Sequence, residues 1–419
     1  MTRPEAFPMT RRGALAGGSA LGSALFTSIA NAQIRPVGVT ATPPPRRPSE
    51  VEHAIVYRRN DEQVGWPHVM GYWNFGNGEL LQQVTSITTT YGNVENVSHD
   101  NLGSEGLGTR QLAFRSMDYG RTWSEPVRNM MTNRDPSMAG AERMVDLQPI
   151  DFLDPDTIIA NSSAGFGTPE GRTTVSVSKD RGASWSPPIP VPLDALNSLS
   201  GMNSALVRPD GTALIWLMEV DESGWNRHPL IHALPPGGHD FHFLTFITPK
   251  HDPKGAADGD YQSTFRYGGH RWFYPRGYLL PNGRMLCTLR SQRDPRGVMW
   301  TELWKSDDAG RTWGFLSRVN DFGAPGSLVI MPDGRLVMVY GYRLMPAGIR
   351  ARVSEDEGAT WGQELIIRDD GGSWDLGYPN AWAMDDGRVG VIYAFNSKDD
   401  PIQLDGGVRH IQRSIFSID

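Results

Sequence analysis

An eight-residue pattern, Ser-x-Asp-x-Gly-x-Thr/Ser-Trp, occurs four times in this chain and constrains its fold more than any other feature. In each copy the Asp side chain can accept hydrogen bonds from the backbone N–H groups of its own turn, and the Gly supplies a positive φ. The Trp can pack its ring beneath the turn against a neighbouring sheet. We therefore predict four β-hairpin turns in which the Asp residues are structural: Ser116–Trp123, Ser178–Trp185, Ser306–Trp313 and Ser354–Trp361.

A tight turn followed by an apolar strand occurs six times, at intervals of about 50 to 80 residues. This spacing fits a four-stranded blade with its loops, so the sequence predicts an all-β, six-bladed β-propeller over residues 51–419 with almost no helix. We expect the first strand, about His53–Arg58, to pair with the C-terminal segment and close the ring. Residues 222–262 are predicted to be irregular. The six turns begin at Asn77, Asp154, Asp210, Asn282, Asp333 and Asp386.

The N-terminal residues predict export from the cytoplasm. An Arg-Arg pair precedes a weakly apolar stretch that ends in an Ala-Asn-Ala cleavage pattern, so residues 1–32 are predicted to be a twin-arginine signal peptide. Residues 33–50 are expected to be an unstructured, proline-rich linker. The mature protein should then begin near Gln33, be periplasmic or secreted, and have no membrane span.

The charge of the chain and its single cysteine argue against a nucleic-acid partner and against a disulfide bond. The formal net charge is −7 and both signs are scattered along the chain, so we expect no nucleic-acid partner. The single cysteine, Cys287, rules out an intrachain disulfide and lies in an apolar run. We interpret it as a buried packing residue rather than a nucleophile, and we predict no cofactor.

The repeated Ser-x-Asp-x-Gly-x-Thr-Trp pattern resembles the Asp box of the sialidase superfamily, and the resemblance covers about residues 50–419. It implies a glycan or glycoconjugate as substrate, although the Asp box also occurs in non-catalytic propellers. Sialidases bind the sugar carboxylate with three arginines, because a planar guanidinium matches a carboxylate. Their nucleophile is a tyrosine activated by a glutamate, and an aspartate is the acid/base residue.

The resemblance assigns roles to particular residues of this chain. We expect these residues to converge at one mouth of the ring. They are Tyr378 as the nucleophile, Arg290 and either Arg343 or Arg350 as carboxylate ligands, and Asp100 or Glu105 as the acid/base residue.

Three departures from the family pattern leave the reaction open, and one is that neither Asp100 nor Glu105 has a distinctive setting. Gly65 stands where the first arginine would be, and Tyr274 stands where the glutamate would be, with Arg276 close by. A tyrosine with a pKa of about 10 is a poor nucleophile at neutral pH, but a cation such as Arg276 can lower that pKa. We expect Tyr274 and Arg276 to lie at the substrate.

The expected function is a sialidase-like exo-glycoside hydrolase acting on a terminal, acidic sugar. The first alternative is a polysaccharide lyase on uronate-containing glycans, in which a Tyr or His removes a proton while a cation neutralises the carboxylate; His68 and His99 are possible bases. The second alternative is a non-catalytic carbohydrate-binding propeller. Trp374, as a stacking platform, and Asp375, as a carboxylate, complete the predicted substrate-binding residues.

Four histidines within fifteen residues raise the question of a metal site. On a strand, His239 and His242 would face opposite sides, whereas in a loop they could converge. We interpret the segment as a solvated loop and predict no metal. The four residues are His228, His232, His239 and His242.

Overall fold

The computed structural model describes residues 43–99, 101–102, 108–128, 143–222, 224, 226–249, 271–292 and 298–419. Within these ranges the chain is all-β with almost no helix, as the sequence predicts. No helix in them is long and apolar enough to cross a membrane. The helices are α1 (Pro67–Met70), α2 (Val94–Val97) and the 3-10 helices η2 (Met144–Leu147) and η3 (Leu404–Gly406).

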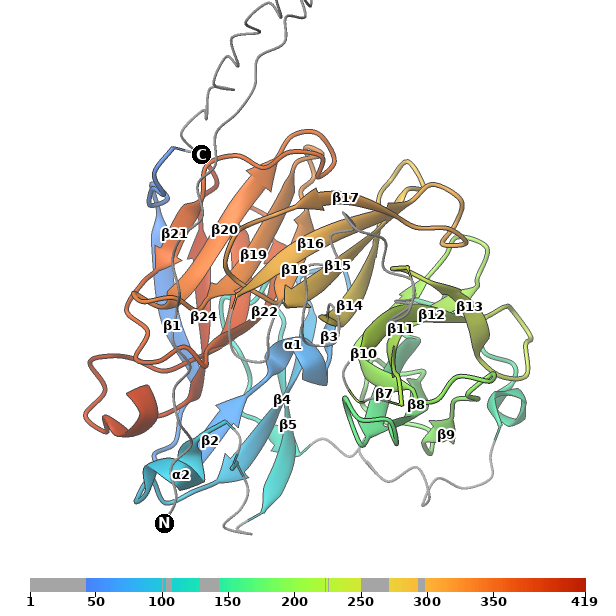
Figure 1. Ribbon diagram of the computed structural model, residues 1–419, viewed down its shortest axis with the longest axis horizontal. Coiled ribbons are helices and arrows are strands. Elements are labelled where there is room, and N and C mark those ends of the chain that lie inside the picture. Colours follow the sequence, from blue (N-terminus) through green and yellow to red (C-terminus); the bar gives the residue numbers. More distant parts are fainter. Residues whose placement is uncertain are drawn as a thin grey trace, which may run out of the picture. The chain divides into compact units, whose positions relative to one another are not determined.

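The described strands form five hydrogen-bonded sheets, in which neighbouring strands are antiparallel except for β12 and β14 (Figure 1). The first sheet has the order β2-β4-β5-β6 with β3 also paired to β4, and the second has the order β7-β8-β9. Their strands are β2 (Glu62–Gly65), β3 (Tyr72–Asn74), β4 (Leu80–Thr88), β5 (Thr109–Ser116), β6 (Val127–Arg128), β7 (Ile158–Ala164), β8 (Arg172–Ser178) and β9 (Ile189–Pro190).

The third sheet has eight strands in the order β10-β11-β12-β14-β15-β16-β17, with β13 also paired to β12. It divides into two groups, because β12 and β14 are paired only at Arg227 and Arg271. Its strands are β10 (Ser200–Val207), β11 (Ala213–Val220), β12 (Arg227–Leu234), β13 (His242–Phe246), β14 (Arg271–Leu279), β15 (Met285–Gln292), β16 (Met299–Ser306) and β17 (Gly314–Arg318).

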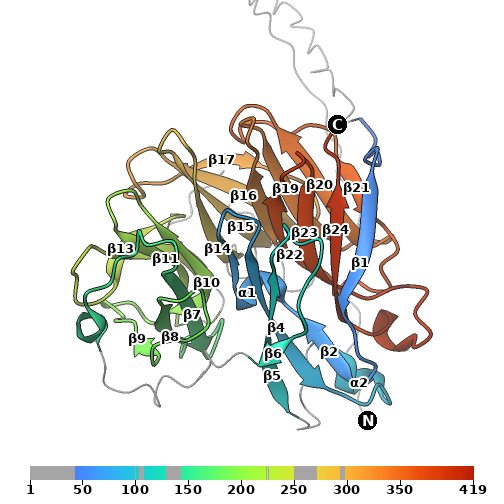
Figure 2. The same cartoon turned by 180° about the vertical axis from the view of Figure 1, so that it is seen from behind.

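The fourth sheet has the order β18-β19-β20-β21, and the fifth has the order β1-β24-β23-β22. Strand β1 runs antiparallel to β24, and Figure 2 shows the two side by side as Figure 1 does. The predicted pairing of the first strand with the C-terminal segment is therefore confirmed. The strands are β1 (Val51–Tyr57), β18 (Gly326–Ile330), β19 (Leu336–Tyr342), β20 (Gly348–Ser354), β21 (Leu365–Arg368), β22 (Gly377–Ala383), β23 (Val389–Phe395) and β24 (His410–Phe416).

The six predicted turn–strand units all form strands, namely β4, β7, β11, β15, β19 and β23. Every residue of β11, β15 and β23 is buried, because apolar clusters pack one sheet against the next. Cys287 in β15 is fully buried, as predicted, and burial raises the pKa of its thiol.

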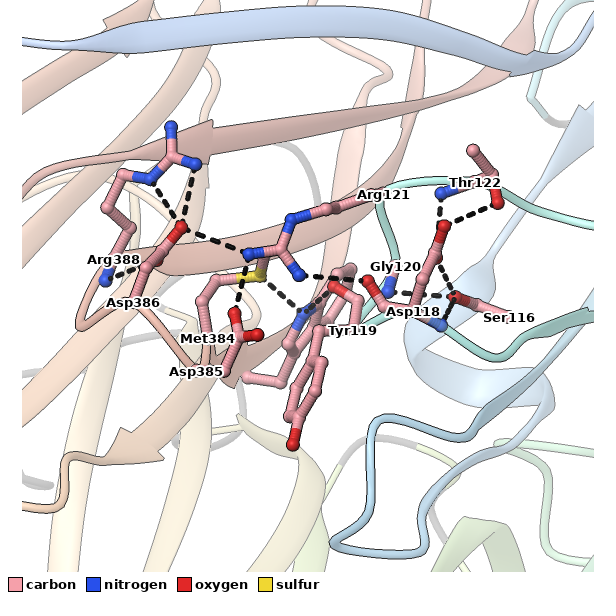
Figure 3. A network of polar contacts seen from close by, with 11 residues as sticks. Ser116, Asp118, Tyr119, Gly120, Arg121, Thr122, Met384, Asp385, Asp386 and Arg388 are labelled. Carbon is pink, nitrogen blue, oxygen red and sulfur yellow. Dashed lines mark hydrogen bonds and ion pairs between the residues drawn. The ribbon is translucent and has the colours of Figure 1, made fainter.

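Each repeated turn is closed by its Ser and Asp side chains, shown for the first copy in Figure 3. Asp118 accepts hydrogen bonds from the Thr122 amide at 2.9 Å and the Thr122 hydroxyl at 2.6 Å. Ser116 Oγ accepts one from the amide of Gly120, whose φ is 75°. The predicted structural role is confirmed, since the same bonds recur at Asp180, Asp308 and Asp356.

The first repeated turn also joins two sheets, those of β5 and of β22–β23 (Figure 3). Arg121 Nη2 lies 2.5 Å from Asp385 Oδ1 and 3.1 Å from Asp386 Oδ2. The ring centroid of Trp123 lies 6.0 Å from that of Trp382, a residue of β22. The Trp of this turn therefore packs against a neighbouring sheet, as predicted.

Two segments are more regular than the sequence suggests. The prediction that residues 222–262 are irregular is wrong for 227–234 and 242–246, because β12 pairs with β11 along its whole length and β13 pairs with β12. The end of the expected linker is hydrogen-bonded to the sheets. The amide of Arg46 donates to Glu364 O at 3.0 Å, and Arg46 O accepts from Ile366 N at 2.7 Å.

We expect Asp118→Ala to lower the free energy of unfolding by about 1–3 kcal/mol, because it removes the acceptor of the turn's hydrogen bonds. Urea denaturation measures the change. The control is Asp321→Ala, which removes a carboxylate that is 80% exposed. An equal effect of the two substitutions would contradict the structural role of Asp118.

Candidate active site

The short helix α1 lies beside strands of several sheets, and polar side chains fix it there (Figure 1). A helix of four residues leaves its carbonyl groups without partners inside the helix. Side chains from β22, β14, β10 and β4 donate hydrogen bonds to these groups and to the next carbonyl. The pairs are Asn380 to Pro67 O (2.8 Å), Arg276 to His68 O, Asn203 to Met70 O (2.6 Å) and Gln82 to Gly71 O (3.0 Å).

Three strands near α1 each carry an irregularity in their pairing at a residue with positive φ. The residues are Asn203 in β10 (φ 49°), Tyr274 in β14 (φ 60°) and Tyr378 in β22 (φ 54°). Positive φ is unfavourable for a tyrosine, and such strained residues cluster at functional sites. A bulge re-aims its side chain, and here the ring centroids of Tyr274 and Tyr378 lie 6.0 Å apart.

Tyr378 is buried, with cations around its ring. Cζ of Arg343 lies 4.8 Å from the ring centroid. Burial raises the pKa of Tyr378, as does the charge of Asp375, but three cations together lower it to about 8: Arg343, His99 and Arg290.

Tyr274, the other phenol of the pair, has the opposite shift. Burial raises its pKa, and so does the neighbouring Tyr378. Tyr378 is therefore the phenol that ionises first, while Tyr274 stays protonated and can donate a hydrogen bond.

Arg343 has the properties of a carboxylate ligand. Its side chain is buried, yet Nε and Nη2 have no hydrogen-bond partner among the described residues. A buried guanidinium with unsatisfied donors favours the binding of an anion. Arg290 lies against the other phenol, with its Cζ 5.3 Å from the ring centroid of Tyr274, and its Nη2 donates to Gln292 at 2.6 Å.

Asp375 connects His99 to Arg409. Its Oδ2 lies 3.0 Å from His99 Nδ1 and 3.2 Å from Arg409 Nη2. Burial raises the pKa of Asp375, but the hydrogen bond from His99 and the charge of Arg409 lower it to about 2. The same hydrogen bond raises the pKa of His99. Asp375 is therefore ionised at neutral pH and favours a protonated His99.

His68 in α1 has the opposite character. Its Nδ1 donates to Pro379 O at 2.8 Å, and its ring lies 6.3 Å from that of Tyr274. Burial and the charge of Arg276 hold the pKa of His68 well below its ordinary value. His68 is therefore neutral over the physiological pH range.

A mostly apolar cavity of 230 Å³ lies beside Arg343 and Trp374. The indole of Trp374 is part of the wall and is 43% exposed, and Arg343 Cζ lies 5.5 Å from it. A ligand whose anion binds Arg343 can therefore extend an apolar face toward Trp374. The remaining wall consists of Val298, Met299, Phe322, Gly323 and Leu344.

The family model of the BNR repeat-like domain matches residues 178–391, more than half of the 419-residue chain. The chain belongs to the BNR repeat-like domain family. No curated protein matches this BNR repeat-like chain in sequence.

Solved structures share the fold of this BNR repeat-like chain. A Dyadobacter fermentans protein of unknown function has a TM-score of 0.64 at 21% identity, over 88% of this chain and 99% of that one. A Hadza microbial sialidase has a TM-score of 0.53 at 16% identity, over 85% and 66%. A Trypanosoma rangeli sialidase in complex with sialic acid has a TM-score of 0.52 at 14% identity, over 88% and 59%.

These likenesses identify a sialidase-superfamily fold, as the sequence resemblance predicts. At such identities they show the fold alone. The chain spans less than two thirds of the length of either sialidase.

Several of the predicted site residues lie together in this BNR repeat-like chain. Contacts and charges connect Tyr378 directly to most of the others, and Trp374 joins the group through Arg343 and His99. The group consists of Tyr274, Tyr378, Arg290, Arg343, Trp374 and Asp375, with His99 as a further neighbour.

Two predicted arginines make contacts with other residues. Arg350 pairs with Glu364 at 2.7 Å and stacks on Tyr342, whereas Arg343 lies against Tyr378. Arg276 bonds to Asn380 and to a carbonyl of α1, and the cations that lower the pKa of Tyr378 are different residues. Asp100 and Glu105, the predicted acid/base candidates, lie outside the described residues.

The four clustered histidines lie in different settings, although His232 and His242 are on the paired strands β12 and β13. His228 and His232 are buried in β12, whereas His242 is exposed and its Nδ1 lies 3.1 Å from Asp194. His239 lies in the loop between β12 and β13. Among the described residues, no group of three His, Cys, Asp or Glu side chains could hold a metal ion.

Sequence reasoning missed Arg409 and the position of Asn203. Arg409 stands just before the last strand with no local pattern around it, and it meets Asp375 only through the fold. The positive φ of Tyr274 and Tyr378 has no signal in the sequence, because glycine is the residue expected at such positions.

We expect Arg343→Met to raise the pKa of Tyr378 from about 8 to above the ordinary value of about 10, because burial then acts without its main opposing charge. Arg343→Lys keeps a positive charge and should leave the pKa lower than Met does. The ultraviolet absorbance of tyrosinate, with Tyr378→Phe as the blank, measures both values. The same titration curve for Met and Lys would contradict the assignment.

Proposed function

We propose that this chain is a sialidase-like exo-glycoside hydrolase that acts on a terminal, acidic sugar. The observation that carries the proposal is Tyr378, with a pKa lowered to about 8, beside Arg343, whose Nε and Nη2 lack partners among the described residues. A phenolate is a nucleophile and a buried guanidinium is a carboxylate ligand. One compact site therefore offers a nucleophile and a carboxylate ligand, two of the groups that the reaction uses.

In the proposed reaction, Arg343 and Arg290 bind the sugar carboxylate. The phenolate oxygen of Tyr378 forms a bond to the anomeric carbon as the glycosidic C–O bond breaks, and that electron pair passes to the leaving oxygen, which takes up a proton. Water then attacks the same carbon, gives up a proton and releases Tyr378 as a phenolate. Tyr274 stabilises the phenolate by donating a hydrogen bond to it.

We also propose that the sheets form a six-bladed β-propeller. Dividing the eight-stranded sheet at its single Arg227–Arg271 pair gives six groups of strands. Contacts link β7 to β10, β15 to β18 and β18 to β22, and β2 of the first group contacts β23 and β24 of the last. A ring of blades would account for the meeting of Tyr274 and Tyr378, which belong to different groups.

A polysaccharide lyase acting on uronates is a second candidate, and Tyr274 is the observation that favours it. Tyr274, which lies next to Tyr378, stays protonated. It therefore cannot accept the hydroxyl proton of Tyr378, as the glutamate of a sialidase would. A phenolate stabilised by cations can instead remove the proton next to a uronate carboxylate that Arg343 neutralises.

For the cellular location, we propose periplasmic placement or secretion by twin-arginine export. The support is the sequence of residues 1–32, which lie outside the described residues.

The proposed function is tested on para-nitrophenyl glycosides of N-acetylneuraminic acid and glucuronic acid and on polyuronates. We expect turnover of at least one acidic substrate, and a loss of at least about a hundredfold in Tyr378→Phe, because phenylalanine has no oxygen to attack or accept a proton. The control is Tyr119→Phe in the first repeated turn.

The products separate the candidate reactions. A saturated sugar supports the hydrolase, and an unsaturated uronate that absorbs in the ultraviolet supports the lyase. Binding of acidic glycans without turnover would identify a non-catalytic module and overturn both.

A further inference from the structure

His99 has a defined orientation at the edge of the candidate site. Its Nδ1 donates a hydrogen bond to Asp375 at 3.0 Å, so Nε2 is the nitrogen that can exchange a proton with a ligand. The ring contacts two indoles, with centroid distances of 6.1 Å to Trp66 and 5.7 Å to Trp374. The side chain is 35% exposed, so a substrate can reach it.

We propose that His99 is the proton donor to the leaving oxygen, and that Asp375, fixed by Arg409, is the residue that orients it. This inference rests on the proposed function, because a donor needs a leaving group to protonate. The sequence resemblance gives this role to a carboxylic acid, Asp100 or Glu105, whereas the described site offers an imidazole.

The other titratable groups of the described site are unsuited to this role. Asp375 has a pKa of about 2 and is 5% exposed, so it holds no proton to give at neutral pH. His68 is neutral and buried, with its Nδ1 proton committed to Pro379 O. Tyr274 is partly buried, and its hydroxyl interacts with Tyr378.

Charges that face His99 set its protonation state. The carboxylate of Asp375 and the phenolate of Tyr378 favour the imidazolium, and Arg343 opposes them. The balance raises the pKa of His99 above its ordinary value. The active form therefore has a negative Tyr378 and a positive His99, which stabilise each other.

The position of Asp375 depends in turn on Arg409. That guanidinium is buried and also bonds to Val97 O and Asp405, both at 2.7 Å. Val97 lies in α2, two residues before His99, so the same arginine holds the backbone that carries the imidazole and the carboxylate that orients it.

His99 gives up one proton in the first step and regains one in the second. The imidazolium gives its Nε2 proton to the glycosidic oxygen, which keeps the electron pair of the broken C–O bond, and His99 becomes neutral. In the second step neutral His99 takes a proton from the attacking water, and the imidazolium is restored. In a lyase, Tyr378 would deprotonate one ring carbon, and the glycosidic oxygen would leave from the neighbouring ring carbon. The proton of His99 would then go to that leaving oxygen.

Leaving-group dependence tests the donor role. The rate with a methyl glycoside, whose leaving oxygen is strongly basic, should fall by at least about a hundredfold in His99→Gln. The para-nitrophenyl glycoside of the same sugar needs little protonation and should lose far less. Equal losses with both substrates would overturn the donor role, since damage to the fold or to binding lowers both rates together.

The orienting role is tested on the imidazole itself. Asp375→Asn should lower the pKa of His99, measured by NMR, and move the matching limb of the pH–rate profile to lower pH. The matched control is Asp194→Asn, which removes the carboxylate beside His242 and should leave the rate unchanged. An unchanged pKa of His99 in Asp375→Asn would overturn the orienting role.

The two proposals fail in different ways. Wild-type protein that turns over no acidic glycoside contradicts the proposed function. Wild-type turnover with no leaving-group dependence in His99→Gln contradicts only the inference on His99.

Discussion

The hydrogen bonds donated to the carbonyl groups of α1 and Gly71 are the constraint on which the candidate site depends. They come from side chains of four strands, so a turn of four residues connects sheets that are distant in sequence. Asn380 and Arg276 also bond to each other, and each stands two residues beyond one of the paired tyrosines. Loss of these bonds would leave buried carbonyls unsatisfied and free both bulges to relax.

Electrostatics then distinguishes two neighbouring phenols. Tyr378 is buried and Tyr274 is partly buried, and burial alone would raise the pKa of both and keep both protonated. Arg343 lies against Tyr378, while Asp375, the nearby negative charge, is balanced by Arg409 and His99. Net positive charge therefore remains at Tyr378, where a phenolate or a bound anion can neutralise it.

The fold shows which proteins this chain resembles, whereas the residues of the site decide which chemistry is available to it. The sheets and the repeated turns follow the sialidase pattern, and the solved sialidases share the fold at low identity. By the sequence resemblance, Tyr274 stands where sialidases have a glutamate. Fold likeness alone leaves the chemistry open, so Tyr378, Arg343 and His99 carry the functional argument.

The sequence by itself determined the turns and the strands that follow them. Asp118 and its three counterparts act within a few residues of their own backbone, and the six Asx turns begin strands for equally local reasons. The resemblance to sialidases, which begins with the same repeated turn, also pointed to Tyr378 and Arg290.

Only the tertiary structure placed Arg343 against Tyr378, bound Arg276 to α1 and joined Arg409 to Asp375, because each contact depends on residues far away in the chain. It also made a strand of residues 227–234, through pairing with β11. A local pattern specifies a turn, but the charge and the partners of a buried side chain are set by whatever the fold places next to it.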